Sequence, residues 1–267
     1  MRAFWISDED FTMAVRPGDH LGAAFDTQEA FVVDAVAFAE QGVAAGGQVM
    51  VFPGDPYRDD LSGFLEHLRE RSPSLAAADR SGQFRVADSR QVQLAPGRFD
   101  PGYLRRLYTA AAGDAVEAGY QGLWVSIDMI WARDADPAAL TAFEAAAFPL
   151  FVGGRLTAVC HYDRRVFAPA VVAATRSAHP AAPDSREPLR HQRLDDGRTL
   201  RVWGDSDMDN ELAFDALLGS LRPGDTLDIS RMSFIDARGA AAIARVPGLA
   251  VEANQRQARL LGMVRAR

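Results

Sequence analysis

The sequence predicts an α/β protein built from two consecutive units. Along the first two thirds of the chain, apolar strand-like runs alternate with helix-like segments, a pattern typical of a parallel sheet covered by helices on both faces. A segment rich in proline, alanine and charge then interrupts this pattern, and a shorter α/β pattern follows. At 267 residues the chain is long enough for each unit to bury its own core.

The first unit is expected over residues 1–177. Residues 1–15 show no clear period and are left unassigned. After them the pattern predicts strands at 20–25, 48–52, 83–88, 123–128 and 156–163. Between these strands it predicts helices at 31–44, about 60–71, after Pro101, at 137–151 and at about 168–177.

Residues 178–190 have no apolar period and are expected to form a linker. The second unit is then expected over residues 191–267, as a small α/β domain. Its predicted elements are a strand around 199–203, a helix over 210–221, the strand DTLDIS, a helix over 237–245, the strand LAVEA and a helix over 255–264.

Composition narrows the function. All 29 basic residues are arginine, so Schiff-base chemistry and phosphate binding by a Walker lysine are excluded. The net charge of −7 and the lack of an arginine-rich face argue against nucleic acid as a partner. No apolar run is long enough for a bilayer, and the acidic N-terminus MRAFWISDED argues against a secretory signal. With a single cysteine excluding internal disulfides, we expect a cytoplasmic protein without membrane association.

Several ordered blocks of the first unit resemble the MEDS domain, a sensory module of bacterial regulators. These blocks are GDHLGAAFDTQEAF, GGQVMVFPGDP, GLWVSIDMIW and AVCHYDRRVF, and the resemblance covers about residues 16–180. It implies a degenerate RecA/KaiC-like fold without a P-loop and a sensor role with no established ligand.

The residues themselves predict that nucleotide chemistry is absent. A P-loop supplies backbone N–H groups and a lysine to the phosphates. Here the first strand runs into Asp26-Thr27-Gln28-Glu29, which has neither glycine nor lysine. Asp26 and Glu29 have capping-box spacing, so they are expected to occupy the amides at the helix start and to repel phosphate.

Parallel sheets bind ligands in the crevice beyond the carboxyl ends of their strands. Several side chains are expected at or near that crevice, where Trp131 and Tyr162 would give flat apolar walls for a small apolar or aromatic ligand. The alternative for Asp128 is a solvated strand end or a helix cap. The candidate ligand-binding residues are His20, Asp26, Asp128, Trp131, Cys160 and Tyr162.

We expect no metal ion and no cofactor. Cys160 and His161 are adjacent on a strand and therefore point to opposite faces, whereas a metal needs three or four convergent ligands. MEDS relatives often have His-x-Cys on the first strand, but this chain keeps His20 and has Gly22 in place of the cysteine. Cys160 is expected to be inert packing, with redox sensing as the alternative. His20 is either a hydrogen-bonded structural histidine or a ligand contact.

The second unit resembles a STAS domain, the fold of anti-sigma factor antagonists. The resemblance covers about residues 188–267 and rests on Gly204–Asp207, DTLDIS and SFIDARG. In antagonists a serine or threonine at the start of the second helix is phosphorylated to abolish binding. Ala237 occupies that position here, with Ser230 and Ser233 as alternative phosphorylation sites. The implied partner-binding residues are Asp205, Asp207, Ser233, Asp236, Ala237, Arg238 and Gly239.

These observations predict a non-catalytic signalling regulator. A sensory domain would be coupled to a module that binds an anti-sigma factor or a related kinase-fold protein. The alternative is a small-ligand-binding scaffold whose STAS-like domain pairs with other STAS domains. No nucleophile elbow, HExxH or paired-carboxylate helix is present in the sequence, so we expect no enzyme activity.

Overall fold

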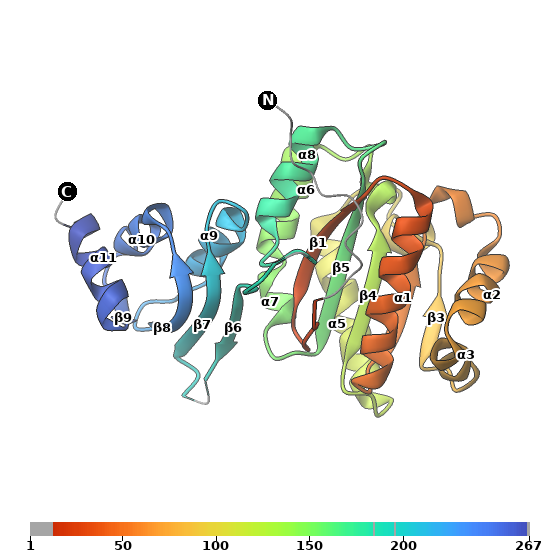
Figure 1. Ribbon diagram of the computed structural model, residues 1–267, viewed down its shortest axis with the longest axis horizontal. Coiled ribbons are helices and arrows are strands. Elements are labelled where there is room, and N and C mark those ends of the chain that lie inside the picture. Colours follow the sequence, from red (N-terminus) through yellow and green to blue (C-terminus); the bar gives the residue numbers. More distant parts are fainter. Residues whose placement is uncertain (1–12, 184, 195, 266–267) are drawn as a thin grey trace.

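A computed structural model describes residues 13–183, 185–194 and 196–265, so residues 1–12 of the unassigned segment 1–15 lie outside this range. The chain forms two α/β units that lie side by side along the long axis of the molecule (Figure 1). This arrangement confirms the predicted fold class.

The described part of the first unit contains a five-stranded, all-parallel sheet with the strand order β1-β5-β4-β2-β3. Strands β4 and β5 are buried along their whole length, which explains why both appear in the sequence as nearly continuous apolar runs. The bounds are β1 (His20–Phe25), β2 (Gln48–Phe52), β3 (Phe84–Val86), β4 (Leu123–Asp128) and β5 (Leu156–Asp163).

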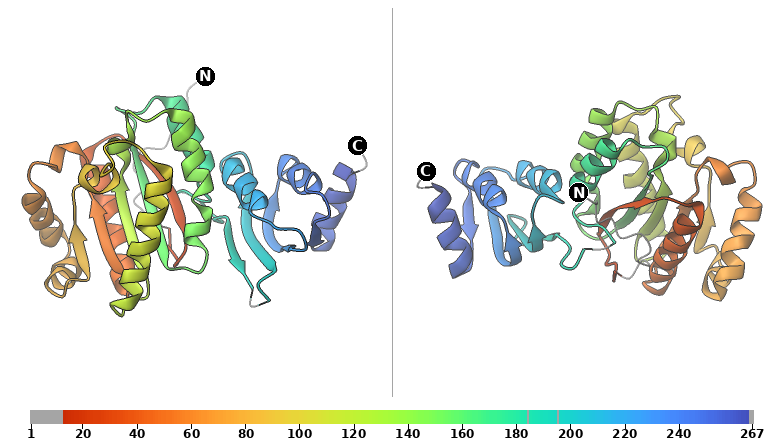
Figure 2. Two further views of the ribbon diagram at one scale, coloured as in Figure 1. Left: turned by 180° about the vertical axis from the view of Figure 1, so that it is seen from behind. Right: turned by 45° about the horizontal axis from the view of Figure 1, so that its top comes forward.

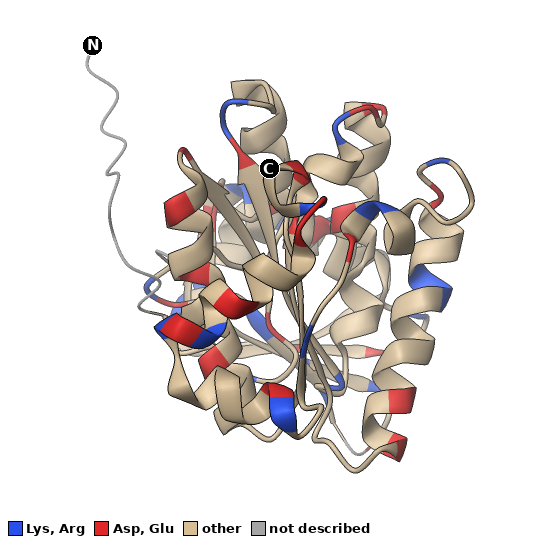
Figure 3. Cartoon of the chain, turned by 90° about the vertical axis from the view of Figure 1, so that its right-hand side faces the viewer, with Lys and Arg blue, Asp and Glu red and all other residues tan. Residues whose placement is uncertain are grey.

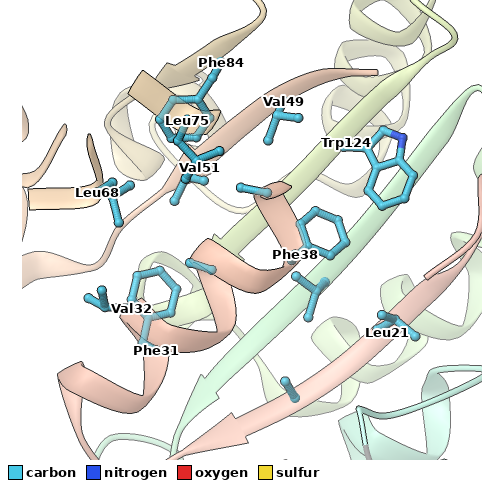
Figure 4. Packing of buried hydrophobic residues seen from close by; sticks show 14 of the residues in the cluster. Leu21, Phe31, Val32, Phe38, Val49, Val51, Leu68, Leu75, Phe84 and Trp124 are labelled. Carbon is cyan, nitrogen blue, oxygen red and sulfur yellow. The ribbon is translucent and has the colours of Figure 1, made fainter. Parts of the chain in front are cut away.

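Helices cover both faces of this sheet (Figure 2). One face packs against α1 (Gln28–Ala44), α2 (Leu61–Arg71) and α3 (Pro73–Arg80), and the core between them contains Phe31, Phe38 and Trp124 (Figure 4). The other face packs against α5 (Pro101–Glu117), α6 (Pro137–Ala146) and α7 (Phe148–Phe151). The remaining helices are η1 (Asp55–Tyr57), α4 (Ser89–Gln93), η2 (Met129–Ala132) and α8 (Pro169–Ala178).

Two local expectations were wrong. The predicted helix over 137–151 breaks between α6 and α7, where Pro149 has no N–H to continue the hydrogen-bond ladder. The start of α1 has no capping box with Asp26, because Thr27 is the N-cap and accepts a hydrogen bond from Ala30. Asp26 and Glu29 instead form ion pairs with Arg164 and Arg71.

The second unit has a mixed sheet, whose described strands follow the order β6-β7-β8-β9. Strands β6 and β7 form an antiparallel hairpin, and β7, β8 and β9 are parallel. Strand β6 was not predicted. The elements are β6 (Arg190–Arg193), β7 (Thr199–Ser206), α9 (Glu211–Gly219), β8 (Thr226–Ile235), α10 (Ala237–Ala244), β9 (Ala250–Glu252) and α11 (Gln255–Arg265).

The segment 178–190, expected to be a linker, connects the two units and packs along β1. Ala181 forms an isolated parallel bridge with Leu21, and His179 is fully buried. At the end of the segment, Arg190 donates two hydrogen bonds of 2.7 Å to the carboxylate of Asp19, just before β1. The first unit therefore holds this segment near its start, at His179 and Ala181, and at its end, at Arg190.

In the view of Figure 3, positions of arginine and of acidic residues are interspersed over the helices and loops. Among the described helices, none is long and apolar enough to cross a membrane.

Removing the Arg190 side chain should destabilise the protein markedly. The Asp19 side chain is only 4% exposed, and Arg190→Ala would leave it buried without a cation, at a cost of about 3 kcal/mol. Arg133→Ala is the control, because it removes a pair with Asp55 in which the arginine is 40% exposed, worth less than about 1 kcal/mol. Urea denaturation of both variants tests this, and equal midpoints would contradict it.

Candidate functional site

Four side chains that can bind metals or exchange protons meet in the first unit beneath α6 and α8. They are His20, Glu144, Cys160 and His179, whose donor atoms all lie within 4.8 Å of one another. All four are buried, with exposures between 0% and 6%. We refer to them below as the His–Glu–Cys cluster.

The cluster is assembled around one carboxylate oxygen. Glu144 Oε2 lies 3.3 Å from His20 Nε2 and 3.4 Å from His179 Nε2. Cys160 Sγ lies 3.7 Å from His20 Nε2 and 3.9 Å from Glu144 Oε2. The second carboxylate oxygen, Oε1, accepts a hydrogen bond of 2.8 Å from the hydroxyl of Tyr162.

Strand pairing explains why His20 and Cys160 meet. Strands β1 and β5 are parallel neighbours, with His20 beside Ala158 and Gly22 beside Cys160. Since side chains at alternate positions share a face, His20 and Cys160 both point toward α6 and α7, whereas His161 points to the opposite face and lies 3.0 Å from Ser126 Oγ. The prediction that Cys160 and His161 diverge is confirmed.

The glycine at position 22 creates the space for His179. A Cβ atom at Gly22 would lie only 2.8 Å from Nδ1 of the His179 ring. That nitrogen lies 2.6 Å from the carbonyl oxygen of Thr175. Because a carbonyl can only accept, Nδ1 carries a proton and Nε2 faces Glu144.

Burial and mutual proximity determine the protonation of the cluster. Burial, with a smaller contribution from His179, lowers the pKa of His20 from 6.5 to about 4. Burial alone would raise the pKa of Glu144, but His179 and His20 outweigh it and hold that pKa well below its usual range. At neutral pH Glu144 is therefore a buried anion and His20 is neutral.

A small cavity adjoins the cluster on the same face of the sheet. Its volume is about 40 Å³, well below the roughly 150 Å³ of a cavity that takes up benzene. The indole Nε1 of Trp131, which lines it, is buried and has no hydrogen-bond partner among the described residues. The walls are mostly apolar and include Leu104, Val125, Ile127, Phe143, Phe151, Leu156 and Ala158 beside His20, Glu144, Cys160, Tyr108 and Trp131.

A larger hollow, of about 530 Å³, lies at the junction of the two units. It is lined by α7 and by the turns of the second unit, including Phe148, Arg193, Arg198 and Arg222. It contains none of the ligand-binding candidates that the sequence indicated.

The structure separates the predicted ligand-binding residues into two groups. His20, Trp131 and Cys160 line the 40 Å³ cavity. Tyr162 contacts the cluster through the hydrogen bond from its hydroxyl to Glu144. Asp26 is exposed at the end of β1, paired with Arg164. The cavity is therefore beneath a face of the sheet, between β4, β5 and the helices, and not in the expected crevice beyond the strand ends.

Asp128 is a helix cap rather than a cavity residue. Its Oδ1 accepts from the N–H of Ile130 at the start of η2, while Oδ2 is buried without a partner among the described residues. Burial raises its pKa to about 7. The side chain packs against the backbone of Gly54, where a Cβ would lie 2.1 Å from Oδ2. The alternative of a cap is confirmed, but the side chain is not solvated.

The partner-binding candidates of the second unit lie at the carboxyl-terminal ends of β7 and β8 and at the start of α10. Asp205 pairs with Phe234 across β7 and β8, and the N–H of Asp236 donates to Ser206. Asp207 follows the end of β7, and Ser233 and Ala237 are exposed. Asp236 caps α10 by accepting from Gly239 at 2.7 Å, and Arg238 forms ion pairs with Glu211 and Asp215 of α9.

The first unit is thus an α/β domain with an all-parallel, five-stranded sheet and a buried polar cluster beside a small cavity. Residues 19–180 match the family described as MEDS, the MEthanogen/methylotroph, DcmR Sensory domain. The match spans more than half of the chain, and the chain belongs to this family of sensory domains. A search of the curated proteins found no match.

Sequence reasoning missed two members of the cluster. Glu144 lies in an alanine-rich helix, and His179 is the second residue of the segment expected to be a linker, so neither is near Cys160 in the sequence. One signal was available: Glu144 is the only acidic residue in the apolar helix over Pro137–Ala146, where a buried carboxylate needs partners.

Cys160 should resist thiol reagents in the native protein. Burial, and then the neighbouring Glu144 carboxylate, raise the pKa of Cys160 well above its usual value. The reactive thiolate is therefore scarce at pH 8. With a chelator present, a disulfide reagent should titrate less than a tenth of the thiol before unfolding and all of it in urea. Rapid reaction of the folded protein would contradict this and favour redox sensing.

Proposed function

We propose that this chain is a non-catalytic signalling regulator. Its MEDS domain senses a small ligand in the cavity beside the His–Glu–Cys cluster, and its second unit, a STAS-like domain, binds an anti-sigma factor or a related kinase-fold protein. The observation that carries the proposal is the direct packing of the helices over the cavity against the second unit.

The contact between the units supports this coupling. Helices α6, α7 and α8 all contact α9, and Phe148 of α7 is part of the hydrophobic core of the second unit. Glu144 lies on α6, Phe151 on α7, and His179 directly follows α8. A ligand that displaces any of these helices therefore acts on α9 without an intermediate element.

The carboxyl-terminal ends of β7 and β8 have the properties of a docking surface. Ala237 is exposed at the start of α10, close to the acidic residues Asp205, Asp207 and Asp236, and Phe234 beside it is 43% exposed. Burial and the nearby Glu187 and Asp207 raise the pKa of Asp205. An exposed aromatic ring with carboxylates around it suits a partner with a basic, partly apolar face.

The cavity limits the ligand to a few heavy atoms. Small apolar molecules should therefore raise the melting temperature of the protein, because a ligand of the folded state stabilises it by mass action, whereas benzene should not. Ala158→Val should abolish the effect by filling the cavity. Ala23→Val is the control, since Ala23 lies on the opposite face of the sheet. A benzene response in wild type would contradict the size limit.

Ala237→Asp should impair partner binding. A second carboxylate next to Asp236 adds repulsion and a desolvation cost at an interface, and we expect affinity to fall at least about tenfold, or 1.4 kcal/mol. The measurement is capture of partners from a lysate, identified by mass spectrometry. Wild type should retain a kinase-fold anti-sigma factor, and Ala237→Asp should lose it.

Two controls accompany this variant. Ala237→Ser changes the same position without adding charge, and Ala138→Asp adds the same charge to the exposed first turn of α6. Both should retain the partner. Capture of STAS-domain proteins alone would favour the scaffold alternative, and equal capture by Ala237→Asp would place the interface elsewhere.

A further inference from the structure

The His–Glu–Cys cluster has the dimensions of a tetrahedral metal site. With metal–nitrogen and metal–oxygen bonds of about 2.0–2.1 Å and a metal–sulfur bond of about 2.3 Å, neighbouring donors of a tetrahedral zinc site lie about 3.3–3.6 Å apart. The corresponding separations here are 3.3, 3.4, 3.7 and 3.9 Å. The other two pairs, His179 with His20 and His179 with Cys160, lie within 4.8 Å, so the donors must draw together to surround an ion.

The His179 ring gives an independent indication. Its Nδ1–H donates to Thr175 O, so in the neutral ring Nε2 presents a lone pair. That atom is completely buried, makes no hydrogen bond within the described chain, and faces Glu144 Oε2 at 3.4 Å. Two lone pairs facing each other in a buried site require a cation between them, either a proton or a metal ion.

Outer contacts orient the ligands as they do in known metal sites. The Thr175 carbonyl fixes the tautomer of His179, and the Tyr162 hydroxyl occupies Glu144 Oε1 and leaves Oε2 for the ion. Such carbonyl and hydroxyl partners are typical of metal-binding histidines and carboxylates. Phe151 stacks on His20 with ring centroids 4.2 Å apart, which fixes the plane of that imidazole.

Charge and donor type select the metal. One thiolate and one carboxylate cancel the charge of a divalent ion, so the filled site is neutral in the protein interior. Two imidazoles and a thiolate favour Zn²⁺ or a similar transition ion over Mg²⁺ and Ca²⁺, which need oxygen ligands. Binding releases the Cys160 thiol proton to solvent, and the sulfur then donates its electron pair to the ion.

We propose that His20, Glu144, Cys160 and His179 bind a tetrahedral divalent transition-metal ion, Zn²⁺ in the first place. The ligands come from β1, α6, β5 and the residue after α8. The ion thus joins the first strand of the sensory domain to the point where the chain leaves for the second unit. This proposal does not depend on the partner of the second unit.

The test uses the full chain without a histidine tag, stripped with a chelator and then titrated with Co²⁺ and Zn²⁺. Wild type should bind one equivalent. The Co²⁺ complex should show the visible bands of tetrahedral coordination and a sulfur-to-cobalt charge-transfer band, which only Cys160 can supply. Zn²⁺ should displace Co²⁺ and raise the melting temperature.

Variants assign the ligands. Cys160→Ser should lose the charge-transfer band, and Glu144→Gln and His179→Gln should each weaken Zn²⁺ binding at least about a hundredfold, because even outer partners of a metal site contribute ten- to hundredfold. His67→Gln is the matched control, since His67 lies on α2 outside the cluster. Circular dichroism checks that each variant folds.

The wild-type titration keeps the proposal falsifiable even if variants unfold. No Co²⁺ or Zn²⁺ binding by the folded wild type, or binding without the charge-transfer band, would overturn it. Unchanged affinity in both Glu144→Gln and His179→Gln would do the same. The cluster would then be a metal-free contact between Glu144 and the two histidines.

Discussion

The first domain depends on the burial of the Glu144 carboxylate. An anion in the protein interior is tolerated only with close compensating partners, and Glu144 has His20, His179 and Tyr162 around it. This requirement determines other choices in the sequence. Gly22 has no side chain because the His179 ring fills the space beside it. The chain after α8 is held against β1, since His179 must reach the carboxylate. The alanine-rich helix α6 thus contributes a buried carboxylate to the cluster.

The His–Glu–Cys cluster lies where three structural features meet. It is next to the 40 Å³ cavity, it lies beneath the helices that contact α9, and it includes the first residue of the segment leading to β6. Glu144 therefore lies both beside the cavity and on a helix that packs against the second unit. The residues that match the family of sensory domains, 19–180, include all four residues of the cluster.

The second unit presents a different kind of surface. In the structure, the sequence pattern SFIDARG after DTLDIS lies at the carboxyl-terminal ends of β7 and β8 and at the start of α10. Asp236 contributes to stability by capping α10, while Ala237 faces solvent and carries no hydroxyl. The second unit contacts the first through Phe148, and the segment that leads to it is held by the bidentate Arg190–Asp19 pair.

The sequence by itself determined the α/β class, the order of most strands and helices, and the division of Cys160 and His161 between opposite faces. These follow from periodicity, which is a local property of the chain. The sequence also excludes chemistry that needs a lysine, because composition alone shows that the chain has none. The tertiary structure decided which distant residues meet. Glu144 and His179 lie 35 residues apart in the sequence, and only the packing of α6 and α8 over β1 and β5 brings them to His20 and Cys160. The cavity beneath the sheet face, instead of a crevice at the strand ends, has the same cause. The position of the cavity depends on how the side chains of the helices fill the space over the strands, and local sequence patterns do not predict that packing.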